Sequence, residues 1–181
     1  MWRKLAKCYP PQLEIISLFL LVLTCYLALF NYSALPDTIP THFDAGGNPD
    51  GWSGKSSVFI FPALSAFIYL LFTSLNIWFV VTKDPKRLIN LPGKWKAALT
   101  AEQTEELRVF MNRCLFLLKL LIQGLAAYGT YITIEIARGR ASGLGAPWFL
   151  FTIAVLILAG FMIWKSLRIT RTARQALIGR Q

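Results

Sequence analysis

Apolar residues are grouped along this chain into four long blocks separated by polar segments. The blocks cover residues 13–34, 58–81, 114–136 and 149–163, and a tryptophan flanks the last block at either end. A helix needs about 20 mainly apolar residues to cross a bilayer, whereas membrane barrel strands alternate over roughly 10 residues. The pattern therefore predicts an all-α integral membrane protein with four transmembrane helices, formed as one domain over residues 1–181.

Composition supports a membrane protein over a soluble one. Of the 181 residues, 55% are hydrophobic and only 15% are charged, and the mean hydropathy is +0.51. A soluble domain has about 25% charged residues. The three cysteines, Cys8, Cys25 and Cys114, form no C-x-x-C pair, so we interpret them as small apolar residues at or inside the membrane.

Basic residues are distributed unevenly between the two ends of the predicted helices. Fourteen of the nineteen Lys and Arg residues lie in the N-terminal flank, the loop 82–108 and the tail 165–181. Only three lie in the other two loops, so the positive-inside rule places both termini in the cytoplasm. This asymmetry explains the net charge of +10 without a nucleic-acid partner. We expect the basic loop and tail to contact anionic lipid headgroups, with Trp95 as a membrane anchor.

Two helical extensions are expected on the cytoplasmic side. Thr100 and Gln103 have the spacing of a capping box, so a helix should begin there and can run unbroken into the third block. It gives the loop 83–113 an amphipathic helix, which follows a predicted turn at residues 91–93. Arg168, Arg171 and Arg174 recur every three residues and indicate a basic stripe on a helical continuation of the fourth block.

Several charged and polar residues lie within the apolar blocks, and for some of them two interpretations stay open. Glu14 and Lys119 have similar depths, so they either pair between helices or extend separately toward the headgroups. Glu135 either pairs with Arg138 one helical turn later or faces the outer loop and binds something there. Gln123 is expected to hydrogen-bond to another helix.

The predicted extracytoplasmic loop, residues 35–57, has the composition of a structured segment rather than a flexible tether. Its prolines favour an extended start, and residues 41–44 form a predicted short strand with His42 and Asp44 on one side. Residues 46–48 and 49–51 have the chemistry of turns. Trp52 is expected to return the chain to the membrane interface.

The loop offers little support for metal binding or catalysis. It has one histidine and no cysteine, whereas structural zinc needs four nitrogen or sulfur ligands. The EF-hand pattern also fails, since Gly46 stands where the first aspartate belongs and Ser57 replaces the final glutamate. We therefore expect no metal, no cofactor, no catalytic residue and no enzymatic activity. His42 either bonds Asp44 or the backbone, or recognises an external ligand as a pH-sensitive donor.

The same loop resembles a known family. The pattern Leu35-Pro36-x-x-Ile39-Pro40-Thr41-His42-Phe43-Asp44, then Gly47-x-x-Asp50-x-Trp52 and Lys55, is similar to the signature of the domain of unknown function 1648. The resemblance covers residues 13–82. That domain forms the N-terminal part of SdpI-like bacterial membrane immunity proteins, which protect the producing cell from a secreted toxin peptide and take part in signalling to a repressor.

The resemblance implies a bacterial cell-membrane protein without known enzymatic activity. We therefore expect an SdpI-like immunity or sensing role, in which the loop binds a secreted peptide or another envelope ligand. The candidate binding residues in the loop are Pro40, His42, Phe43, Asp44, Asp50, Trp52 and Lys55. One alternative is a small transporter or permeation component, which a homo-oligomer could form. The other is an assembly partner of a larger membrane complex.

Overall fold

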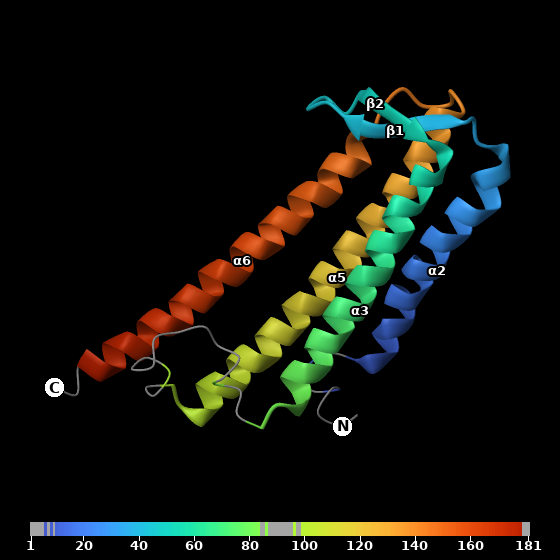
Figure 1. The fold of residues 1–181 in the computed structure, drawn as a ribbon. Helices are drawn as coiled ribbons and strands as arrows, with labels where there is room; N and C mark the ends of the chain where they lie inside the picture. The colour runs from blue at the N-terminus through green and yellow to red at the C-terminus, as the bar shows by residue number, and fades with distance from the viewer. Residues whose placement is uncertain are drawn as a thin grey trace. The chain divides into compact units, whose positions relative to one another are not determined.

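The computed structural model describes residues 10–83 and 99–178, together with residues 6, 8, 86 and 96. The predicted turn at 91–93 and Trp95 lie outside these residues. The elements follow one another as in Figure 1: the 3-10 turn Pro11–Leu13, α2 (Glu14–Asn31), the 3-10 turn Tyr32–Ala34, β1 (Thr38–Phe43), β2 (Pro49–Gly54), the 3-10 turn Lys55–Phe59, α3 (Ile60–Val81), α5 (Ala101–Ala137) and α6 (Gly145–Ile178).

Within the described residues, four helical segments are long and apolar enough to cross a membrane. They are Pro11–Ala34, Lys55–Val81, Ala101–Ala137 and Gly145–Ile169, each containing one of the four apolar blocks. The predicted multi-pass, mainly helical membrane protein is therefore confirmed. A small two-stranded sheet between the first and second segments is the structured loop that the sequence predicted.

Helix α5 begins and ends with defined capping interactions. The Gln103 amide donates to Thr100 Oγ1 and the Thr100 amide donates to Gln103 Oε1, both at 3.1 Å, so the predicted capping box is confirmed. At the other end Gly139, with φ of +70°, donates to the Ile136 carbonyl, and Arg140 donates to the Glu135 carbonyl. This is a Schellman motif. The helix runs unbroken for 37 residues, as expected from the cap.

Helix α6 extends well beyond the fourth apolar block. Its 34 residues run from Gly145 to Ile178, whereas the fourth apolar block ends at residue 163. The expected helical continuation of the tail is therefore confirmed, and the backbone of Arg168, Arg171 and Arg174 belongs to it.

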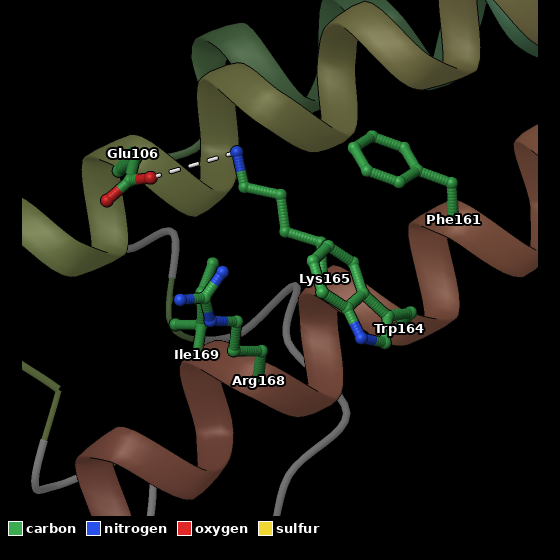
Figure 2. Close-up of a pocket in the computed structure, with 6 residues that line it drawn as sticks. All are labelled: Glu106, Phe161, Trp164, Lys165, Arg168 and Ile169. Carbon is green, nitrogen blue, oxygen red and sulfur yellow. Dashed lines mark ion pairs between the residues drawn. The ribbon is translucent and has the colours of Figure 1, made fainter.

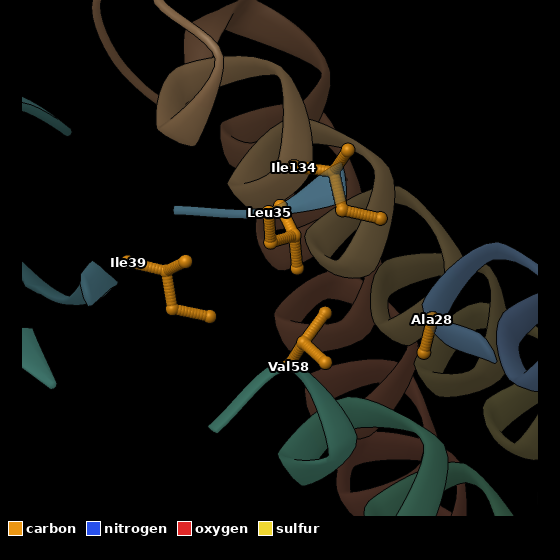
Figure 3. Close-up of a cluster of buried hydrophobic side chains, with 5 residues drawn as sticks. All are labelled: Ala28, Leu35, Ile39, Val58 and Ile134. Carbon is orange, nitrogen blue, oxygen red and sulfur yellow. The ribbon is translucent and has the colours of Figure 1, made fainter. Parts of the chain in front are cut away.

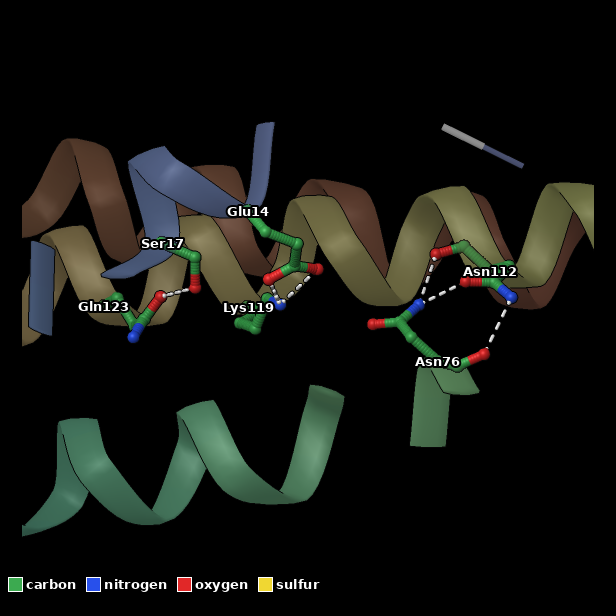
Figure 4. Close-up of polar contacts among 6 residues, drawn as sticks. All are labelled: Glu14, Ser17, Asn76, Asn112, Lys119 and Gln123. Atoms are coloured by element: carbon green, nitrogen blue, oxygen red, sulfur yellow. Dashed lines mark hydrogen bonds and ion pairs between the residues drawn. The ribbon is translucent and has the colours of Figure 1, made fainter. Parts of the chain in front are cut away.

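The chain divides into two compact units, which are described separately. The first unit contains residues 1–13, 72–118 and 156–181, and the second contains residues 14–71 and 119–155. In the first unit, Asn76 and Asn112 bind each other across α3 and α5 (Figure 4). The Asn76 side-chain amide donates to the backbone carbonyl of Asn112 at 2.9 Å and also to its side-chain oxygen, and the Asn112 amide donates back to the Asn76 carbonyl. These bonds lock the register of the two helices.

In the second unit, the β1–β2 hairpin packs onto the helix ends through a small apolar core. Ile39 of β1 has no exposed surface and belongs to one buried cluster with residues of three helical segments (Figure 3). The other members of the cluster are Ala28, Leu35, Val58 and Ile134. Complete burial of one such side chain contributes about 1.5–3 kcal/mol. The hairpin is therefore anchored to the helices rather than free.

The hairpin differs from the sequence prediction in the bounds of its strand and of its turn. A strand was expected at residues 41–44, whereas β1 begins at Thr38 and ends at Phe43. Residues 49–51 were expected to form a turn, but Pro49, Asp50 and Gly51 belong to β2, which pairs antiparallel with β1. The turn is confined to the residues between Phe43 and Pro49. The register shifts on either side of His42, so β1 contains a bulge there. Cross-strand pairing overrides the turn preference of the Pro-Asp-Gly sequence, because the strand lies at a sheet edge where proline is tolerated.

Candidate functional site: the hairpin and the intramembrane polar cluster

The turn of the hairpin is organised by Asp44. Its carboxylate accepts hydrogen bonds from the Asn48 backbone amide at 2.8 Å and from the Asn48 side chain at 3.2 Å. These bonds favour the ionised form, so the backbone amide of Asn48 first, and its side chain second, hold the pKa of Asp44 below its ordinary value. Asp44 is fully exposed yet fixed in orientation, and it is committed to the turn.

His42 pairs with Asp50 across the two strands. The His42 Nδ1 atom lies 2.5 Å from Asp50 Oδ1, and the two side chains are 74% and 46% exposed. The expectation that His42 bonds Asp44 or the backbone is therefore corrected: the bulge beside His42 brings Asp50 into reach. Among the described residues, no three His, Cys, Asp or Glu side chains gather closely enough to hold a metal ion.

Lys55 closes the base of the hairpin. Its Nζ atom lies 3.2 Å from Asp37 Oδ1, and its backbone amide donates to the Asp37 carbonyl at 2.9 Å. The ammonium also lies 5.8 Å from the centre of the Tyr32 ring. Lys55 therefore has a structural use at the point where the chain leaves the sheet.

The remaining candidates in the loop divide by exposure. Pro40 is buried, and Phe43 is half-buried against a cluster formed by Ile132, Ile136 and Leu144. Trp52 is 54% exposed. Trp52 and the His42–Asp50 pair are thus the exposed candidates of the hairpin, whereas Pro40 and Phe43 belong to its packed side chains.

A contact that sequence reasoning did not identify joins the hairpin turn to the segment between α5 and α6. The Leu144 amide donates to the Gly47 carbonyl at 2.9 Å, and the Tyr128 hydroxyl donates to the Leu144 carbonyl at 2.7 Å. Tyr128 belongs to α5, so these bonds connect a helix to the tip of the sheet. No spacing in the sequence indicates this contact, because the segments are about a hundred residues apart.

Within the helices, Glu14 and Lys119 form an ion pair. Lys119 Nζ donates to both carboxylate oxygens of Glu14, at 2.7 and 2.9 Å (Figure 4). The Lys119 side chain has no exposed surface and that of Glu14 is 23% exposed. The centre of the Tyr69 ring lies 5.5 Å from the ammonium. The question left open by the sequence is answered in favour of pairing between α2 and α5.

A second polar contact lies one turn along the same two helices. The Ser17 hydroxyl donates to Gln123 Oε1 at 2.5 Å, and both side chains are completely buried (Figure 4). The expected interhelical bond of Gln123 is confirmed. Its partner Ser17 was not singled out, although it follows Glu14 by three residues and Gln123 follows Lys119 by four. Those spacings place both pairs on facing stripes.

Glu135 forms local contacts near the end of α5. Its Oε1 atom lies 4.0 Å from Arg138 Nη1 and 3.6 Å from Arg140 Nη1. The local helix pair with Arg138 is therefore present, and Arg140 joins it. Both distances exceed a hydrogen bond, so this pair is weak.

Two comparisons show what part of the chain is similar to. Residues 19–66 match the family model described as Domain of unknown function (DUF1648). An uncharacterized protein of Archaeoglobus fulgidus is 36% identical over 81 residues, which cover 43% of each chain. The chain thus spans less than half the length of the curated relative it matches. No solved structure matches it. The protein is a multi-pass membrane protein whose residues 19–66, from α2 through the hairpin into α3, are similar to the DUF1648 domain.

Proposed function

We propose that this protein is a non-enzymatic receptor of the cell membrane, in which the β1–β2 hairpin binds a secreted peptide or another envelope ligand in an SdpI-like immunity or sensing role. In this arrangement the hairpin faces the extracytoplasmic side and both termini are cytoplasmic. The distribution of Lys and Arg residues supports that orientation.

The observation that carries the proposal is an exposed recognition surface on a fixed support. Trp52 is 54% exposed beside the His42–Asp50 pair, whereas Ile39 and Pro40 of the paired strand are buried. Exposed tryptophans on a rigid backbone are typical of binding hot spots, because little conformational entropy is lost when a partner covers them. A segment that served only to connect α2 and α3 would need neither the cross-strand pair nor the anchored core.

A killing assay tests the proposal. A deletion strain and a strain complemented with the wild-type gene are challenged with a panel of secreted membrane-active peptides. The deletion is expected to be sensitised to at least one peptide, and the wild-type gene to restore survival. Equal survival of both strains across the panel would remove immunity to those peptides from consideration.

Direct binding then locates the contact. Binding of the protective peptide to the full chain in lipid nanodiscs is measured for Trp52→Ala, His42→Ala and the control Thr41→Ala, which changes an exposed residue of the same strand. We expect at least tenfold weaker binding for the first two, about 1.4 kcal/mol or more, and unchanged binding for the control. Unchanged peptide binding in both variants would place the peptide contact outside Trp52 and His42.

Transport is the competing function, and the buried Glu14–Lys119 pair offers a test of it. Solute flux through vesicles that contain the wild-type chain, and its loss in Lys119→Ala, would favour transport. In our proposal Lys119 instead fixes α2 against α5 through Glu14. Crosslinking in cells additionally distinguishes a homo-oligomer from assembly with another membrane protein.

A further inference from the structure

A pocket of about 330 Å³ lies along α6 in the first unit, whereas the hairpin that the proposed function uses belongs to the second unit. Figure 2 shows the residues that line it: Glu106, Phe161, Trp164, Lys165, Arg168 and Ile169. All except Glu106 belong to α6 and recur at intervals of one and three, which places them on one face of the helix. Glu106 belongs to α5.

The lining changes from apolar to basic along the helix. Phe161 and Trp164 come first, followed by Lys165 and Arg168, and the fourth apolar block ends at residue 163. The basic part of the pocket therefore lies where a membrane-crossing helix reaches the headgroup layer, and the aromatic part lies on its hydrocarbon side. Tryptophan and basic side chains both prefer this boundary.

Both cations of the lining reach the surface, since Arg168 is exposed and the Lys165 side chain is 31% exposed. Lys165 Nζ lies 3.8 Å from Glu106 Oε1, which exceeds a hydrogen bond, and 4.3 Å from the centre of the Phe110 ring. The Arg168 guanidinium carbon lies 5.6 Å from the Trp164 ring centre. These ring contacts position both charged groups without enclosing them. Among the six residues that line the pocket, two are cations and one is a carboxylate, so the lining carries more positive than negative charge.

We propose that this pocket binds the phosphodiester headgroup of an anionic membrane phospholipid. Lys165 and Arg168 bind the phosphate, and an acyl chain follows Phe161 and Trp164 toward the membrane interior. Arginine and lysine are the usual phosphate-binding side chains, and a chain bound along aromatic rings removes apolar surface from water. Such binding differs from a general attraction of the basic tail to the membrane, because it depends on two particular cations of the tail.

Native mass spectrometry of the purified full chain tests this assignment. The protein is titrated with phosphatidylglycerol, or with phosphatidylcholine as a lipid of the same chain length without net charge. The wild type is expected to retain phosphatidylglycerol at least tenfold more strongly than phosphatidylcholine. Lys165→Gln and Arg168→Gln are each expected to reduce that preference at least fivefold, and Glu106→Gln to preserve or increase it.

Arg171→Gln is the matched control, because Arg171 is an exposed cation of the same helix that does not line the pocket. The site predicts that this variant keeps the wild-type preference. An equal loss in Arg171→Gln would overturn the proposal in favour of diffuse attraction, and displacement of the lipid by millimolar inorganic phosphate would overturn the lipid as the ligand. Lys165→Arg, which keeps the charge, is expected to bind as the wild type does, and its unfolding temperature checks that the fold is retained.

Discussion

Neutralising Glu14 and neutralising Lys119 should lower the stability of the protein by different amounts. Glu14→Gln leaves an ammonium whose side chain has no exposed surface. Lys119→Met leaves a carboxylate that is 23% exposed and lies in the first turn of α2, where backbone amides and the helix dipole stabilise negative charge. Glu14→Gln should therefore destabilise the protein more than Lys119→Met.

The magnitude follows from the geometry. At 2.7 Å, and with an effective dielectric constant of about 20, the gross attraction between the two charges is about 6 kcal/mol. Most of this offsets the desolvation of the charges. Removal of one partner of a buried pair typically costs about 3–5 kcal/mol, which we expect for Glu14→Gln. For Lys119→Met we expect about 1–3 kcal/mol, because Glu14 can be hydrated.

The assay is reversible unfolding in mixed lipid–detergent micelles, followed by tryptophan fluorescence. The double variant Glu14→Gln/Lys119→Met should lose less stability than Glu14→Gln alone, since an apolar side chain then meets an uncharged one. Glu135→Gln is the control, and should change stability by about 0–1 kcal/mol because its ion pairs are long.

Two results would refute this reasoning. If Lys119→Met were as destabilising as Glu14→Gln, exposure of the remaining charge would not decide the loss. If the losses of the two single variants simply added in the double variant, the residues would not interact energetically, whatever their distance.

Three further changes test other contacts. Gly129→Ala should cost about 1–3 kcal/mol, seen as a lower unfolding temperature, because the added methyl would lie 2.8 Å from an aromatic ring of α3; an unchanged temperature would show that α3 yields there. Asn76→Leu should lower the free energy of unfolding by about 1–2 kcal/mol. The double variant Asn76→Leu/Asn112→Leu should lose less than the two single variants together, and additive losses would contradict their mutual bonds. The turn bond from Asn48 to Asp44 should persist above the ordinary carboxyl pKa and weaken as pH falls through the lowered pKa; the Asn48 amide shift in NMR reports this, and the same transition in Asp44→Asn would contradict it.

The membrane-crossing helices and their ends could be predicted because their signals are local. The length of an apolar block determines whether it can cross a bilayer, and the Thr100–Gln103 spacing alone specifies a cap. The pairing of Glu14 with Lys119 could not be decided in this way. Depth along two helices is readable from a sequence, but the rotation of each helix about its axis depends on packing.

The hairpin shows the opposite limit. The sequence correctly indicated a structured loop with an extended segment before its turn. It did not show that pairing with β1 would override the turn preference of Pro49-Asp50-Gly51. The partner of His42 depended on a bulge, which follows from pairing between strands rather than from neighbouring residues. The pocket on α6 was likewise not predictable, because it needs Glu106 from another helix.

The order of synthesis adds a meaning to the Glu14–Lys119 pair. Lys119 follows Glu14 by 105 residues, so at about 5–20 residues per second the ribosome needs roughly 5–20 s to supply the partner. During that interval the first two helices must remain in the membrane with an unmatched acid. Glu14 lies in the first turn of α2, near the edge of the membrane, where its carboxylate can be hydrated until Lys119 is synthesised. Arrival of the third helix would then mark the moment at which the nascent bundle becomes committed to its final arrangement.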